Sequence, residues 1–267
     1  GLDGPAAFTF TPNGTIVYLE RATGEVRFRN PKTGFDRLFF DISGVNGQGE
    51  RGALGVALHP RWPSKPWVYG YVTRSVAGTL RNQIVRIRER DGRGTGVTTI
   101  LSTPAASSPY HNGGRITFGP DAKLYEIVGD GHSLANAQDL SRNLRGKILR
   151  MNPDGSVPGT NPSIDGKRTR IFAYGIRNSF GFTFDPVTEA LWETENGPGD
   201  SDEINRVTSG GNFGWPNVRG IAGDQNFLDP IAVYFPLPCN PCTIAPTGII
   251  AIPEDSTVYP EPYKNNL

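Results

Sequence analysis

One histidine stands in a glycine-rich stretch between two short apolar runs, in the sequence SSPYHNGGRITFGPDAKLYEIVGDG. His111 precedes the first run and Asp130 follows the second, so a turn at Pro120 would bring both side chains to the same end of an antiparallel pair. A carboxylate that accepts a hydrogen bond from one imidazole nitrogen fixes the tautomer and makes the other nitrogen a better base. The stretch therefore predicts a general base. The alternative is a histidine whose ring is satisfied by the backbone of its own turn.

A second candidate group lies in the sequence AYGIRNSFGFTF, where Arg177 and Asn178 precede another apolar run. A guanidinium is a planar fork of permanent positive charge that suits oxyanions. An arginine exposed on the surface is the alternative. The position matches that of His111 one repeat earlier, and this match favours a binding role.

The sequence TENGPGDSDEINRV is rich in oxygen ligands, and Gly197-Pro198 would expose backbone carbonyls in a tight turn. Hard cations such as calcium take carboxylates and backbone carbonyls together. The EF-hand spacing is absent, and a solvated acidic turn is the alternative. The side chains concerned are those of Glu195, Asn196, Asp200, Asp202, Glu203 and Asn205.

The elements that must position these residues repeat along the chain. One pattern occurs at Pro12, Pro60, Pro120 and Pro186, with a weaker copy at Pro253. It consists of an apolar run, then Phe or Leu, one residue, the proline, a turn and a second apolar run. The runs EVRFRN, QIVRIRER, GKILRMN and DEINRV follow as later strands of each unit. Four-stranded units at such a period predict an all-β fold, a β-propeller of four-stranded antiparallel blades. A plain β-sandwich, the alternative, would space its strands irregularly.

The fifth unit stops early, so either a neighbouring molecule covers the open edge or the chain is a fragment of a longer protein. We favour the fragment and expect one propeller domain over residues 1–267, truncated at its C-terminal end, with the closing blade or blades missing after residue 267. Helical periodicity is scarce, and the best candidate helix is Ala135 to Leu144. His59 is expected to be structural because it lies within the repeated turn motif.

Composition excludes several classes of protein. The chain has 27 basic and 26 acidic residues with no block of like charge, so we expect no nucleic acid and no membrane surface as a partner. No run approaches 18 apolar residues, so no membrane span is expected. Cys239 and Cys242 predict a local disulfide or two free thiols, since a zinc site would need two further ligands. One methionine and two paired cysteines suit a periplasmic or secreted protein.

Taken together, these motifs resemble the soluble PQQ-dependent aldose sugar dehydrogenases, the glucose/sorbosone dehydrogenase family of six-bladed propellers. The match runs in order over nearly the whole chain. Its segments are GERGALGVALHP, HNGGRITFGPDAKLY, VGDG, AQDLSRNLRGKILRMNPDGSVP, YGIRNSFGFTFDP, LWETENGPGDSDEIN and GGNFGWPNV, with IAPTGIIAI as a looser one.

The resemblance implies a role for each matching position. It makes His111 the general base, Asp130 the carboxylate that supports it, and Arg177 and Asn178 cofactor contacts beside the reacting quinone carbonyl. Glu50 occupies a position near the cofactor where relatives place Gln or Glu. The resemblance also implies two calcium sites. The carbonyls of Gly197 and Pro198 would bind a calcium that also binds PQQ. Glu203 and the Phe213 carbonyl would form a second, structural site.

The implied function is oxidation of the C1 hydroxyl of aldose sugars to the lactone by hydride transfer to PQQ, with Ca²⁺. A monomer or homodimer is expected. Two departures matter: further basic contacts to PQQ would lie beyond Leu267, and Tyr110 stands where some members carry Asp, which bears on substrate choice. The alternative functions are a calcium-dependent propeller lactonase or hydrolase and a non-catalytic recognition propeller.

Overall fold

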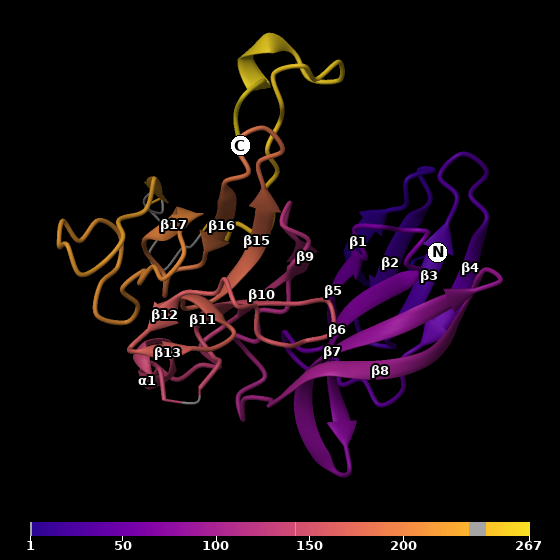
Figure 1. Cartoon of the computed structure of the whole chain (residues 1–267), viewed down its shortest axis with the longest axis horizontal. Helices are drawn as coiled ribbons and strands as arrows, with labels where there is room; N and C mark the ends of the chain where they lie inside the picture. The colour runs from indigo at the N-terminus through magenta and orange to yellow at the C-terminus, as the bar shows by residue number, and fades with distance from the viewer. Residues whose placement is uncertain (1, 142, 235–243) are drawn as a thin grey trace.

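The computed structural model describes residues 2–141, 143–234 and 244–267. Its strands form four antiparallel sheets of four strands each, arranged in chain order around a common axis (Figure 1). We call these sheets blades 1 to 4. Cys239 and Cys242 lie outside the described residues, so the prediction of a local disulfide or free thiols stays open.

In all four blades the strands follow the chain order outward from the axis. Blade 1 contains β1 (Pro5–Phe10), β2 (Ile16–Glu20), β3 (Glu25–Arg29) and β4 (Asp36–Asp41). Blade 2 contains β5 (Ala53–Leu58), β6 (Trp67–Val76), β7 (Thr79–Arg90) and β8 (Arg93–Pro104). Blade 4 contains β15 (Ser179–Phe184), β16 (Leu191–Glu195), β17 (Asp202–Val207) and β18 (Ala232–Tyr234).

Blade 3 carries insertions between its strands. It contains β9 (Ile116–Phe118), β10 (Leu124–Val128), β11 (Lys147–Met151) and β14 (Ile171–Tyr174). The hairpin of β12 (Ser163–Ile164) and β13 (Lys167–Arg168) precedes the last of these strands. The short helix α1 (Ala135–Gln138) lies between β10 and β11.

Apolar side chains fill the spaces between successive blades, so strands in the middle of a blade are buried on both faces. In β10 all five residues are buried. Leu124 and Val128 pack in the cluster shared with blade 2, whereas Tyr125 and Ile127 pack in the cluster shared with blade 4. Burial on both faces explains why these strands read as continuous apolar runs.

The four strands nearest the axis are the first strand of each blade, since β1 contacts β5, β5 contacts β9 and β9 contacts β15. Pro12, Pro60, Pro120 and Pro186 each lie in the turn between the first and second strand of a blade. The prediction of propeller blades from this repeat is therefore confirmed.

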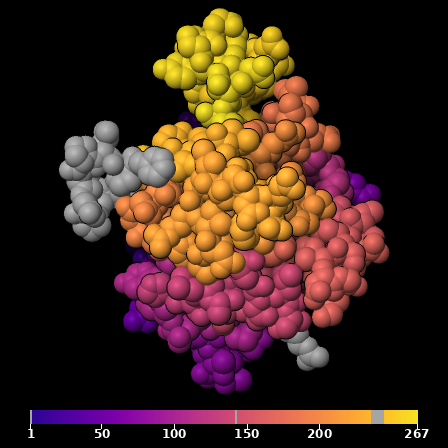
Figure 2. Space-filling view, turned by 90° about the vertical axis from the view of Figure 1, so that its left-hand side faces the viewer, coloured from indigo at the N-terminus to yellow at the C-terminus, as the bar shows by residue number. Residues whose placement is uncertain are grey.

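Two predicted elements need correction. The predicted fifth repeat at Pro253 forms no strand in the described part of the chain; its backbone makes one isolated bridge, Ile252 to Asn266, and is followed by the 3-10 turn η1 (Glu261–Tyr263). A strand needs a continuous ladder of backbone hydrogen bonds, and among the described residues this segment has only that one bridge. These C-terminal residues project beyond blade 4 (Figure 2).

The predicted helix at Ala135 to Leu144 ends at Gln138. Beyond it, the side chains of Asp139 and Asn143 accept hydrogen bonds from the backbone amides of Ser141 and Arg145. Such local bonds compete with helical ones. No helix in the described ranges is long and apolar enough to cross a membrane.

Candidate active site

The segments that lead into the inner strands meet at one end of the axis. Each of them pairs with the segment that leaves the second strand of the same blade. In blade 3, Gly131 N donates to the His111 carbonyl at 3.0 Å, and in blade 4, Asn196 N donates to the Asn178 carbonyl at 2.9 Å. The same register therefore places His111 beside Asp130 and Arg177 beside the Asn196–Gly197 turn.

His111 and Asp130 form a buried pair. His111 Nδ1 lies 2.7 Å from Asp130 Oδ1, and the two side chains are 9% and 1% exposed. Asp130 Oδ1 also accepts the backbone N–H of His132 at 2.7 Å, and its other oxygen, Oδ2, accepts the indole N–H of Trp215 at 2.9 Å. Burial alone would raise the pKa of Asp130, but its interactions with His111, the Trp215 indole and the His132 backbone N–H outweigh burial and lower that pKa.

An ionised Asp130 can only accept hydrogen bonds, so His111 Nδ1 must donate. The neutral imidazole then keeps its lone pair on Nε2, which is the atom that can act as a base. His111 has φ of +57° and His132 has φ of +63°, both in the left-handed region that non-glycine residues seldom adopt. Strained backbone of this kind clusters at functional sites because the surrounding structure must hold it.

Glu50 links the segments leading into three blades. Its Oε2 accepts the backbone N–H of His111 at 2.7 Å and Asn178 Nδ2 at 3.3 Å. Its own backbone N–H donates to the Pro109 carbonyl at 3.1 Å. The sequence identified Glu50 only as a position near a cofactor, and the structure adds that this carboxylate positions the backbone of His111.

Arg177 is held from several sides. Its Nη1 donates to the Asn196 carbonyl at 2.6 Å and its backbone N–H donates to Glu195 Oε1 at 2.8 Å. Its guanidinium carbon lies 5.5 Å from the centre of the Trp215 ring, a cation–π contact. Burial lowers the pKa of Arg177, and the neighbouring carboxylates, Asp130 first, oppose that effect.

Several buried polar atoms around Arg177 have no hydrogen-bond partner. They are Arg177 Nε, Asn178 Oδ1, Glu195 Oε2 and Asn196 Oδ1. A buried polar atom without a hydrogen-bond partner destabilises the fold. A group of such atoms, in residues that are adjacent in the chain or hydrogen-bonded to one another, therefore points to a polar ligand. Arg177 Nε can only donate, so it fits a carbonyl or carboxylate oxygen of a cofactor, whereas the three oxygens fit a hydrogen-bond donor or a cation.

The Gly197-Pro198 turn is tightly folded. Gly197 N donates to Asp202 Oδ1 at 2.8 Å, and a Cβ at Gly197 would overlap the Asp200 carbonyl oxygen. Within residues 2–141, 143–234 and 244–267, no three His, Cys, Asp or Glu side chains are grouped as a metal site. A calcium bound here would therefore rely on backbone carbonyls and on oxygens of the cofactor.

Glu203, the other predicted calcium ligand, already uses both of its oxygens. Oε1 accepts Gly220 N at 2.7 Å and Oε2 accepts Asn205 Nδ2 at 3.1 Å. Phe213 is buried in the cluster between blades 3 and 4, and its backbone N–H donates to the Tyr174 carbonyl. Burial raises the pKa of Glu203, and burial raises that of the neighbouring Glu193 to about 8. A second calcium at Glu203 and the Phe213 carbonyl stays a prediction.

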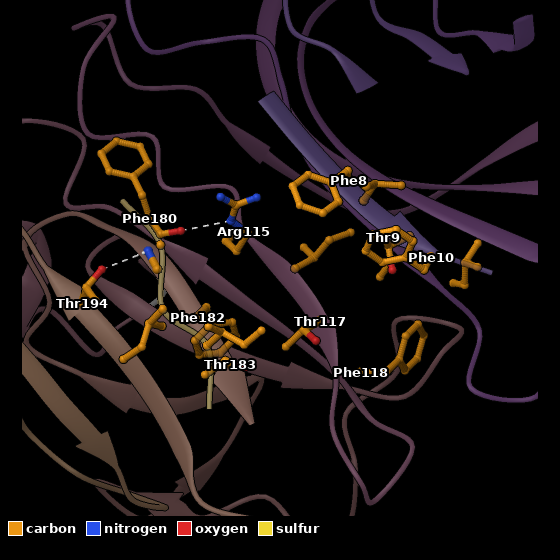
Figure 3. A pocket seen from close by; sticks show the side chains of 18 of the residues that line it. Phe8, Thr9, Phe10, Arg115, Thr117, Phe118, Phe180, Phe182, Thr183 and Thr194 are labelled. Carbon is orange, nitrogen blue, oxygen red and sulfur yellow. Dashed lines mark hydrogen bonds between the residues drawn. The ribbon is translucent and has the colours of Figure 1, made fainter. Parts of the chain in front are cut away.

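A large cavity lies elsewhere in the described part of the chain. It measures about 1200 Å³ and is lined by the inner strands of all four blades and by residues 244–250, with Phe8, Phe10, Phe118 and Phe180 in its wall (Figure 3). Neither His111, Asp130 nor Arg177 lines it. Since the hydrogen-bonded pair and the unsatisfied polar atoms lie at the other end of the strands, we assign the chemistry to that end.

Sequence reasoning missed one residue at the centre of the site. Trp215 contacts both Asp130 and Arg177, yet it is 85 residues from Asp130 along the chain. No local pattern predicts such a contact. The only signal was the segment GGNFGWPNV, which matched the family without suggesting a role.

The fold and the site define a β-propeller with an imidazole–carboxylate pair and a buried guanidinium at one end of its axis. Residues 2–253 match the model of the glucose/sorbosone dehydrogenase family, and the chain belongs to this family.

Relatives agree with this assignment. The chain is 33% identical to quinoprotein glucose dehydrogenase B of Acinetobacter calcoaceticus over 85% of its own length and 53% of the relative's. A putative oxidoreductase (glucose dehydrogenase) of Thermus thermophilus superposes with a TM-score of 0.81 at 39% identity, covering 88% of this chain and 70% of that one. The PQQ-bound aldose sugar dehydrogenase of Streptomyces coelicolor gives 0.79 at 34% identity, covering 88% and 69%. The chain thus spans about half the length of the first of these relatives.

Proposed function

We propose that this chain carries the catalytic end of a PQQ- and Ca²⁺-dependent aldose sugar dehydrogenase, which oxidises the C1 hydroxyl of an aldose to the lactone. The observation that carries the proposal is the pair of His111 and the doubly bonded Asp130 beside Arg177 and its unsatisfied polar neighbours. The named relatives include a quinoprotein glucose dehydrogenase and a PQQ-bound aldose sugar dehydrogenase, which supports the cofactor.

In this proposal the protein moves one proton. His111 Nε2 accepts the proton of the C1 hydroxyl as the C1–H bond breaks, so the sugar loses a proton and a hydride and becomes the lactone. Asp130 keeps His111 in the correct tautomer and stabilises the imidazolium that forms. PQQ, when bound, supplies the two-electron acceptor for the hydride, and Ca²⁺ supplies positive charge beside it.

Arg177 has an electrostatic role. Its guanidinium is fixed by the Asn196 carbonyl and the Trp215 ring, so it can stabilise negative charge that develops on an oxygen without reorganising. Arg177, Asn178 and Glu50 would hold PQQ, the carbonyls of Gly197 and Pro198 would hold its calcium, and Glu203 with the Phe213 carbonyl would hold a second one.

We also propose that the complete ring has six blades. Four blades are about two thirds of six, and the chain covers 70% of the Thermus thermophilus structure. Phe8 and Phe10 on the inner strand β1 are 65% and 57% exposed, as expected of an inner strand that has no further blade beside it among the described residues.

The test is reconstitution with PQQ and CaCl₂, followed by dye reduction with several aldoses. We expect turnover that needs both additions, and a loss of about 10²- to 10⁴-fold in kcat for His111→Ala. A separate absorbance titration with PQQ should show that this variant still binds the quinone. His59→Gln is the matched control, because His59 lies in the turn after β5 and its Nδ1 accepts Arg61 N.

Two other functions give different results in the same experiments. A calcium-dependent lactonase would hydrolyse a lactone with calcium and without PQQ. A recognition propeller would show no absorbance change on titration with the quinone. Either result, obtained with folded protein, would contradict the dehydrogenase proposal.

A further inference from the structure

A buried lysine at the start of β11 takes no part in the proposed chemistry. Lys147 is 0% exposed, and its ammonium Nζ donates to the carbonyls of Asn136, Ala137 and Arg145 at 2.7, 2.8 and 2.8 Å. An ammonium has three N–H donors, so all of them are used, and all three acceptors are neutral. Burial lowers the pKa of Lys147 to about 8, and the charge of Asp139 opposes that effect. An apolar side chain would avoid the burial of a charge, so this position favours a specific role for the ammonium.

Two of the three carbonyls belong to the short helix α1. Its four residues form little more than one turn, and a helix of this length is not stable by itself. The last carbonyls of a helix lack intrahelical partners and form its negative end, so a cation there is favourable. A Cβ at Gly146 would overlap the backbone of Ala137, so α1 also packs directly on the residue before Lys147. Lys147 therefore fixes α1 against the start of β11.

The helix α1 binds both residues that orient the base. Asn136 Nδ2 donates to the Asp130 carbonyl at 2.7 Å, and Gln138 Nε2 donates to the Trp215 carbonyl at 2.8 Å. Asp130 and Trp215 are bonded to each other through their side chains, and this bond fixes the carboxylate beside His111. One turn of helix thus holds two residues that are 85 positions apart in the chain.

The same helix contacts the segment that leads to Arg177. The Ala137 carbonyl, which is an acceptor of Lys147, also accepts Gly175 N at 3.2 Å. The Gly175 carbonyl accepts Trp215 N at 3.1 Å. The contacts of α1 therefore reach every group that surrounds the carboxylate, and the ammonium lies at their common origin.

We propose that Lys147 is a positioning residue for the dehydrogenation: it holds α1, and α1 holds the Asp130–Trp215 pair. The orientation of the His111 imidazole follows from that pair. This inference rests on the proposed function, because it gives the contacts of α1 a role in the alignment of the general base. All three N–H groups of Lys147 are bonded to carbonyls, so Lys147 acts through position and moves no proton.

The first test follows the Nδ1–H proton of His111 by NMR on protein with isotope-labelled histidine, without PQQ or calcium. The chain has three histidines, and His111→Ala identifies the signal. Lys147→Met keeps a long unbranched side chain and removes the ammonium. We expect the Nδ1–H resonance to move upfield and to exchange faster with water, because its hydrogen bond to Asp130 becomes longer.

A second variant tests the same connection while the buried charge stays in place. Gln138→Met removes the donor to the Trp215 carbonyl and leaves the three bonds of Lys147 intact, so it decides the question even if Lys147→Met does not fold. It should move the His111 resonance in the same direction. An unchanged resonance in Gln138→Met would overturn the proposal.

Arg150→Met is the matched control for Lys147→Met. It also removes a buried cation from β11, but the carboxylate of Asp121 and the amide of Asn161, which bind this cation, lie outside the site. We expect it to lower the melting temperature and to leave the His111 resonance in place. The same upfield shift in Arg150→Met would show a general loosening of blade 3 and would contradict a specific role for Lys147.

Kinetics on protein reconstituted with PQQ and CaCl₂ give a second readout. We expect kcat to fall about 10- to 10²-fold in Lys147→Met with little change in KM, because a misplaced base slows the reaction without removing a contact to the sugar. A kcat equal to that of Arg150→Met would count against the proposal. If the unaltered protein turns over no sugar, the dehydrogenase proposal fails, while the NMR comparison still decides whether Lys147 positions His111.

Discussion

The carboxyl group of Asp130 binds His111 through one oxygen and Trp215 through the other, at 2.7 and 2.9 Å. The imidazole comes from the segment before β9 and the indole from the segment after β17. A carboxylate bonded on both oxygens cannot rotate without breaking a bond, so the orientation of the His111 imidazole depends on contacts between blades 3 and 4.

Asp130→Asn should remove the charge that fixes the tautomer of His111. The amide can still bond to Trp215 or to the imidazole, but it no longer requires His111 Nδ1 to carry the proton. We expect kcat to fall by about 10²- to 10⁴-fold, with a smaller change in KM. Steady-state kinetics on reconstituted protein measure this, and Asp154→Asn, in an exposed turn, is the control. Equal kcat values for both variants would contradict the role of Asp130.

Trp215→Phe should separate the hydrogen bond from the aromatic contact. Phenylalanine keeps a ring for Arg177 but leaves Asp130 Oδ2 without its donor. We expect a loss of about 1–3 kcal/mol in the free energy of unfolding, since a buried acceptor is left unsatisfied, together with a lower kcat.

Trp192→Phe is the matched control for this change. The indole Nε1 of Trp192 is buried without a partner, so its removal breaks no hydrogen bond. Denaturant unfolding of both variants should therefore show the larger loss for Trp215→Phe. A larger loss for Trp192→Phe would argue against the bond to Asp130.

Glu50 offers a test of positioning against charge. Glu50→Gln keeps a carbonyl oxygen that can accept the His111 and Asn178 N–H groups, whereas Glu50→Ala leaves both without it. We expect kcat/KM within about threefold of the unaltered protein for Gln and a drop of about tenfold or more for Ala. If Gln is as damaging as Ala, the charge of Glu50 matters and its role as an acceptor does not explain the loss.

The sequence predicted the parts of the site that follow from local pattern. The proline-marked turns define the first two strands of each blade, and antiparallel pairing across the turn at Pro120 is enough to place Asp130 beside His111. The same register places Arg177 beside Asn196. These relationships depend on residues fewer than 20 apart in the chain.

Contacts between blades could not be predicted in this way. Glu50 is 61 residues from His111 and 128 from Asn178, and these bonds depend on how the blades are placed around the axis. The weaker repeat at Pro253 had the right residue types, yet residue pattern alone does not supply a ladder partner. Sequence therefore indicated which residues lie together at this end of the axis but not which of them position the others.

Glu126 predicts how stability changes with pH. This residue of β10 is 3% exposed, its Oε2 has no hydrogen-bond partner, and burial raises its pKa to about 8. Between its usual pKa of 4.5 and about 8, the folded state holds a proton that the unfolded state has released, so raising the pH destabilises the fold.

Glu126→Gln is neutral in both states and should not show this loss. We expect the melting temperature of the variant to exceed that of the unaltered protein by more at pH 8 than at pH 5. Between these two pH values, the gain of the variant in the free energy of unfolding should grow by an amount on the order of 1–3 kcal/mol. Thermal unfolding at several pH values measures it, and Glu89→Gln, on the partly exposed end of β7, is the control. If the difference in melting temperature between Glu126→Gln and the unaltered protein stays constant from pH 5 to pH 8, Glu126 titrates alike in the folded and unfolded chain and the prediction is wrong.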